Sequence, residues 1–124
     1  MESKKPKDIK QRTFEFALEV VRLCRKLDER SWVARTIGKQ LLRSGTSIGA
    51  NIEEAQAGQS RADFINKYSI ALKEARETIY WLRLLSESDK QVDNQIEKLQ
   101  HEAGEITKIL GSIIVNAKKN ARSS

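Results

Sequence analysis

This 124-residue chain has one histidine and one cysteine, and its charged and polar residues form no catalytic or metal-binding motif. The single histidine, His101, lacks the Glu-x-x-His pattern of di-iron bundles and lies away from the apolar positions of its segment. The single cysteine, Cys24, falls among apolar positions, where a buried, inert thiol is expected. Residues 45–49 lack the Gly-Lys-Ser/Thr ending and the preceding strand of a phosphate loop. We therefore expect a protein that is not an enzyme and that uses no cofactor or metal.

Positive charge is the more distinctive feature of the chain. Residues 1–43 hold 12 Lys/Arg and 6 Asp/Glu, which accounts for the whole net charge of +6. Arg35, Lys39 and Arg43 recur every four residues along one edge of a predicted helix, where like charges repel by a few tenths of a kcal/mol. Such a ridge suits the phosphates of a nucleic acid, while the alternative is a solvated basic face that aids solubility. The predicted surface comprises Arg35, Lys39, Arg43, Lys4, Lys5, Lys7 and Lys10.

A second group of polar residues predicts helix packing. Residues 40–58 have a helical pattern, yet they contain Gly45 and Gly49, each of which costs a helix about 1 kcal/mol relative to alanine. Glycines one turn apart suggest close approach by another helix, and we expect this helix to meet more neighbours than one bundle supplies. Beside the glycines, short or polar side chains recur at helical spacing. This polar stripe comprises Ser44, Ser47, Asn51 and Glu54.

A matching flank is expected on the helix that follows. Its members at helical spacing are Lys67, Ile70, Glu74, Glu77 and Trp81. We hypothesise that this flank faces the polar stripe, in the same chain or in the next subunit. Asn51 would then donate to Glu74 or Glu77, as a polar layer that fixes register or assembly. The alternatives are a ligand or catalytic site, or simple solvated surface. We expect Trp81 to be buried between subunits and Trp32 to pack at the turn near residues 28–31.

The elements that must position these residues are four amphipathic helices. Helical periodicity predicts them at about residues 9–27, 32–57, 61–86 and 91–118, joined by short polar breaks. The first helix is expected to bury Phe14, Ala17, Val20, Val21, Cys24 and Leu27, and the second Leu41, Gly45, Ile48, Ile52 and Ala55. The third is expected to bury a stripe from Phe64 to Leu85, and the last a stripe from Val92 through Leu110 and Ile113. Four such helices form an antiparallel up-down-up-down bundle most economically. We predict an all-α four-helix-bundle domain over residues 1–124, with frayed ends at about residues 1–8 and 120–124.

Residues 40–85 resemble the signature of the 23S rRNA intervening-sequence protein family. The likeness is carried by Ser47-Ile48-x-x-Asn51-Ile52-x-Glu54-Ala55, then Ser60 and Phe64, then Ala71 with Glu74 and Glu77. Many members carry proline where this chain has Gly49. The resemblance implies a bacterial four-helix bundle, a homopentameric ring in related members, and a relation to accessory proteins of diversity-generating retroelements, which bind nucleic acid and a reverse transcriptase. It implies no enzymatic activity.

Partners and location follow from these features. The leading hypothesis is a homo-oligomer that binds RNA or DNA. The runner-up is a scaffold for a protein partner, such as a reverse transcriptase, without nucleic-acid contact. The charged N-terminus is unlike a signal peptide, and no apolar run is as long as a membrane span. We therefore expect a cytoplasmic protein that does not bind membranes.

Overall fold

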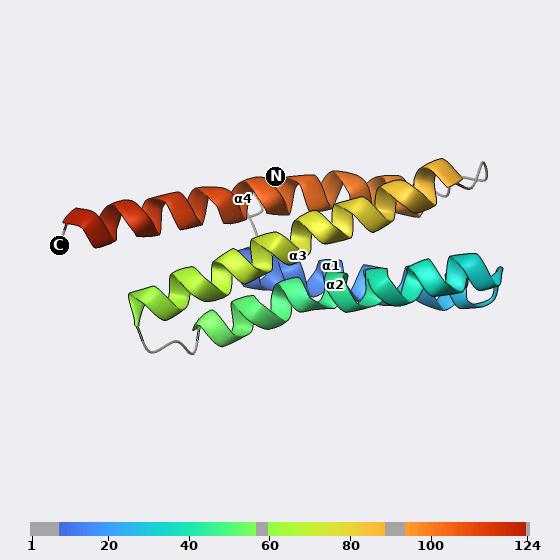
Figure 1. Cartoon of the computed structure of the whole chain (residues 1–124), viewed down its shortest axis with the longest axis horizontal. Helices are drawn as coiled ribbons and strands as arrows, with labels where there is room; N and C mark the ends of the chain where they lie inside the picture. Colours follow the sequence, from blue (N-terminus) through green and yellow to red (C-terminus); the bar gives the residue numbers. More distant parts are fainter. Residues whose placement is uncertain (1–7, 57–59, 89–93, 124) are drawn as a thin grey trace, which may run out of the picture.

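Four long helices pack side by side in a computed structural model that describes residues 8–56, 60–88 and 94–123. They are α1 (Ile9–Asp28), α2 (Trp32–Gln56), α3 (Arg61–Ser88) and α4 (Asn94–Ser123). Each helix packs against the next, and α1 also contacts α4, so that the four enclose one core (Figure 1). The predicted antiparallel four-helix bundle is confirmed.

The helix ends agree with the sequence patterns to within a few residues. Asp8 caps α1 by accepting a hydrogen bond from the backbone N–H of Gln11, and Ser60 does the same for Asp63 at the start of α3. α4 continues to Ser123 instead of ending near residue 118. The predicted end of the second helix at about residue 57 and the predicted start of the last helix at about residue 91 lie outside the described residues.

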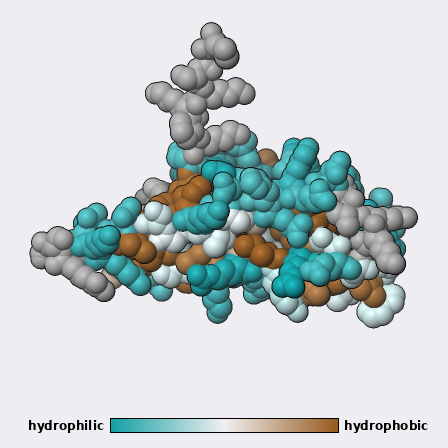
Figure 2. All heavy atoms as spheres, turned by 90° about the horizontal axis from the view of Figure 1, so that it is seen from above, coloured by the Kyte–Doolittle hydropathy of each residue, from teal (hydrophilic) through white to brown (hydrophobic). Residues whose placement is uncertain are grey.

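Three of the four predicted core stripes match the buried residues closely. In α2, Leu41, Ile48 and Ile52 have no exposed surface. The α3 stripe is buried from Tyr68 to Leu85. In α4 the stripe holds as far as Leu110, and then Ile114 is buried in place of the predicted Ile113. Seen from above, hydrophilic side chains cover much of the surface and hydrophobic patches emerge between them (Figure 2).

The predicted stripe of α1 is correct only in part, because Val20 and Leu27 are buried but Phe14 is not. Its buried residues are Thr13, Phe16, Val20, Leu23 and Leu27, whereas Phe14 is 56% exposed. Phe14 and Leu18 extend the apolar surface of this helix beyond its buried face, so helical periodicity alone leaves its rotation open. The rotation of α1 is decided by its contact with α2.

Gly45 and Gly49 of α2 create that contact. A Cβ atom added to Gly45 would lie 2.9 Å from Cγ1 of Val20, and one added to Gly49 would lie 3.3 Å from Oγ1 of Thr13. The absence of both Cβ atoms therefore lets α1 and α2 approach closely. The neighbour that the glycines accommodate is α1 of the same chain, so they require no further subunit.

Candidate nucleic-acid interface

Two of the predicted basic residues lie in a groove between the end of α1 and the start of α2. Arg35 and Lys39 of α2 line it, and Arg25 of α1 also lines it. Val21 and Leu42 contribute apolar surface, and the groove encloses about 580 Å³. Helix pairing thus adds a cation from α1 to the ridge predicted on α2. We call this groove, with Arg25, Arg35 and Lys39 in its lining, the basic groove.

The cations of the basic groove have no ionic partner within the described part of the chain. Arg25, Arg35 and Lys39 are all exposed, and none forms an ion pair there, although Asp28 and Glu29 also line the groove. An unpaired guanidinium or ammonium can meet an incoming phosphate without first losing a carboxylate. These three side chains are therefore available to an anionic ligand.

Arg43 does not share this property, which corrects the predicted ridge. Its guanidinium pairs with Glu74 at 3.2 Å and also with Glu77, both on α3. Hydrogen bonds to these two carboxylates, Glu77 first, raise the pKa of Arg43 above its usual value. Arg43 therefore bridges α2 and α3 and is already neutralised.

The remaining predicted cations do not extend the basic groove. The ammonium of Lys10 lies 3.4 Å from Glu53 across the α1–α2 contact. Lys4, Lys5 and Lys7 lie outside the described residues. The part of the predicted surface that is both described and unpaired is therefore Arg35 and Lys39 alone.

The polar stripe of α2 faces the predicted flank of α3 within one chain. Oγ1 of Thr78 lies 3.0 Å from Oγ of the buried Ser44, and Lys67 forms an ion pair of 2.6 Å with Glu54. With Arg43 between its two glutamates, these contacts tie α2 to α3 along their length.

Two members of the stripe bond to their own helix. The side-chain amide of Asn51 donates to the carbonyl of Ser47 at 2.8 Å, so within one chain it does not form the expected hydrogen bond to Glu74 or Glu77. The hydroxyl of Ser47 donates in turn to the carbonyl of Arg43 at 2.5 Å. Short polar side chains in a helix reach the carbonyl one turn earlier more easily than a neighbouring helix.

The two tryptophans occupy different environments. Trp81 is half-buried, and its indole N–H donates to Glu77 at 3.0 Å. This hydrogen bond, followed by that of Arg43, lowers the pKa of Glu77. Trp32, expected to pack at the turn, is instead 70% exposed. As the first residue of α2, it lies beyond the part of the helix that α1 covers.

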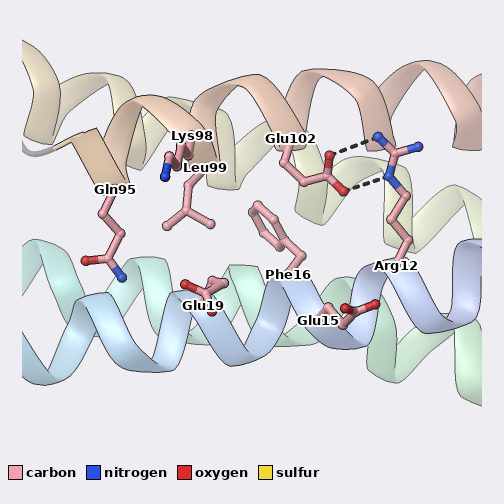
Figure 3. A pocket seen from close by; sticks show the side chains of 8 residues that line it. All are labelled: Arg12, Glu15, Phe16, Glu19, Gln95, Lys98, Leu99 and Glu102. Carbon is pink, nitrogen blue, oxygen red and sulfur yellow. Dashed lines mark hydrogen bonds and ion pairs between the residues drawn. The ribbon is translucent and has the colours of Figure 1, made fainter. Parts of the chain in front are cut away.

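A second pocket, which the sequence did not indicate, lies between α1 and α4 (Figure 3). Phe16 and Leu99 point into it from opposite helices, and Arg12 holds Glu102 at one end with two hydrogen bonds of 2.7 and 2.9 Å. These hydrogen bonds raise the pKa of Arg12. The two partners lie 90 residues apart, so no local pattern could indicate the pocket. Its charges are mixed, and it offers no continuous basic surface.

Comparison with known proteins assigns the family. The family model of the 23S rRNA-intervening sequence protein matches residues 5–112. The chain belongs to this family. The match includes the basic groove and the whole α2–α3 contact. A comparison with curated proteins gave no match.

A solved structure from the same family resembles the chain closely. It is a protein of unknown function from the S23 ribosomal protein family of Bacteroides thetaiotaomicron VPI-5482. The two share 50% sequence identity, and the alignment has a TM-score of 0.79 and covers 86% of this chain and 98% of the other. In the present structure, no helix among the described residues is long and apolar enough to cross a membrane.

Proposed function

We propose that this chain is a non-enzymatic, homo-oligomeric bundle that binds RNA or DNA through the basic groove. One observation carries the proposal: Arg25, Arg35 and Lys39 come from two helices, line one groove, and have no ionic partner among the described residues. Such cations displace counterions from a phosphate backbone without breaking an existing contact, which makes them the most readily available phosphate ligands on this surface.

The strength of binding would come from repetition. Three cations alone give a weak, salt-sensitive contact, because each phosphate contact mainly releases counterions. Several copies held in one assembly would engage one long nucleic acid together, which raises the apparent affinity without any new type of contact. Binding is therefore expected to depend little on sequence and to fall steeply as salt rises.

Fluorescence anisotropy with a structured RNA, measured from about 50 to about 200 mM salt, tests the proposal. Changing Arg25, Arg35 and Lys39 together to glutamine should weaken binding to all sequences and should flatten the salt dependence by about two to three in the log–log slope.

A matched control removes the same charge elsewhere. Lys73, Arg76 and Lys98 are exposed and form no ion pair among the described residues, so their joint change to glutamine should have a smaller effect. No binding at about 50 mM salt, binding that ignores salt, or equal losses in the two triple variants would contradict the proposal.

An exposed apolar surface favours self-association as part of this function. Phe14 is 56% exposed and Leu18 is 39% exposed, both on α1. Leu18 lies one turn from Phe14, and neither residue lines the basic groove. These side chains thus form an apolar patch of the kind that often marks protein contacts.

Light scattering after gel filtration tests this assembly. The unmodified chain should elute at a multiple of its 14.1 kDa mass, and Leu18→Glu should lower that multiple because it places a charge in the contact. A control, Tyr80→Glu, changes an exposed aromatic residue on α3 and should leave the mass unchanged. A monomeric unmodified chain would contradict the assembly.

A further inference from the structure

Trp32 is the most exposed large hydrophobic side chain in the described part of the chain, at 70%. Its indole N–H donates to no described residue, unlike that of Trp81, which is bonded to Glu77. Leaving a tryptophan in water forgoes the large stabilisation that burying its ring would give. The turn between α1 and α2 therefore displays an aromatic face that the fold itself does not use.

The position of Trp32 relates it to the basic groove. Arg35 and Lys39 follow it by three and seven residues on α2, so the three share one face of the helix. At 1.5 Å per residue they span about 10 Å along the helix axis. The aromatic ring thus stands at one end of a row of cations that have no ionic partner among the described residues.

We infer that Trp32 stacks on an unpaired nucleobase while Arg35 and Lys39 contact the neighbouring phosphates, so that the ligand is single-stranded RNA or DNA, or a loop within a folded RNA. Cations that follow the backbone, combined with aromatic faces that stack on bases, are the usual means of binding single strands. A duplex offers its phosphates to the cations but no free base to the ring. This inference rests on the proposed function and adds a preference for unpaired strands.

The test uses the full chain with Trp81→Phe, so that Trp32 is its one tryptophan. Adding oligo(dT) or oligo(rU) of about 12 nucleotides should quench the fluorescence of Trp32, because stacking brings the base against the indole. A duplex of equal length should quench it much less.

Affinity measurements provide the second readout. Trp32→Ala should weaken single-strand binding by about 5- to 150-fold and change duplex binding little. Trp32→Phe should retain part of the affinity because it keeps an aromatic face. The matched control is Tyr80→Ala, which removes an aromatic ring that is 55% exposed on α3 and should leave both affinities unchanged.

The outcomes separate this inference from the proposed function. If neither single strands nor duplexes bind, both fail. If both bind equally and Trp32→Ala alters neither affinity, the basic groove stands and the stacking role of Trp32 is overturned. A Trp32→Ala chain with unchanged single-strand affinity but a lower assembly mass would also overturn it, since Trp32 would then be a protein contact.

Discussion

Gly45→Ala should fail to stabilise the bundle, although alanine favours helix formation. The added methyl group would lie 2.9 Å from Cγ1 and 3.0 Å from Cγ2 of Val20, closer than carbon atoms pack. Val20 is fully buried, and its β-branched side chain has one strongly preferred rotamer in a helix. The clash can therefore be relieved only by moving α1 away from α2.

Two opposing terms set the magnitude of this effect. Replacing glycine by alanine inside a helix gains about 1 kcal/mol, whereas forcing an extra methyl group into a packed contact costs about 1–3 kcal/mol. The expected net result lies between no change and a loss of about 2 kcal/mol in the free energy of unfolding. Gly104 supplies the matched control, because a Cβ atom there meets nothing within 4 Å. Gly104→Ala should thus stabilise the protein by about 1 kcal/mol.

Urea unfolding followed by circular dichroism measures both variants, and the difference between them isolates the clash. A third measurement places Gly45→Ala on a Val20→Ala background. There the methyl group added at position 45 has room, so Gly45→Ala should raise the free energy of unfolding. The reasoning is refuted if Gly45→Ala stabilises as much as Gly104→Ala, or if the Val20→Ala background leaves its effect unchanged.

Three further predictions concern the polar contacts and the thiol. Trp81 and Arg43 lower the pKa of Glu77 below its ordinary value of 4.5. The Glu77 carboxylate therefore contributes stability above about pH 4.5, and this stability is lost as the pH falls through the pKa of the folded state. Carboxyl titration by NMR should show the low pKa of Glu77 and a higher pKa in Trp81→Phe. Ser44→Ala should cost about 1 kcal/mol in urea unfolding, and no more, because Thr78 keeps its hydrogen bond to a backbone carbonyl of α3. Burial raises the pKa of Cys24 to about 11, so its modification by a disulfide reagent at about pH 8 should be slow in the folded protein and fast in urea.

The sequence was sufficient for the architecture because four helical segments with short breaks between them are evident, and α2 and α4 each carry one narrow apolar stripe. In α2 the stripe through Leu41, Ile48 and Ile52 permits a single orientation, and the structure has it. In α1, Phe14 and Leu18 extend the apolar surface beyond the buried face, so the sequence admitted an orientation that buries Phe14 as readily as the one that buries Phe16. Gly49 of α2 favours the second orientation, because it accommodates Thr13, which the predicted stripe left out. The contact between α1 and α2, which the pattern of neither helix alone reveals, therefore determines the rotation of α1 that periodicity left open.

The candidate site was harder to predict for a related reason. Lys39 and Arg43 have the same charge sign, lie one turn apart and look alike in the sequence, yet only Arg43 is paired, by two glutamates that lie 31 and 34 residues further along the chain. Likewise the indole of Trp81 donates a hydrogen bond to Glu77 one turn away, whereas the indole of Trp32 donates to no described residue. Whether a cation or an aromatic ring is free to bind a ligand depends on which residues lie beside it, and these belong to the neighbouring helix for Arg43 and to the same helix for Trp81. The charge run in the sequence could therefore indicate the helix that carries unpaired cations while including a residue whose charge the fold had already neutralised.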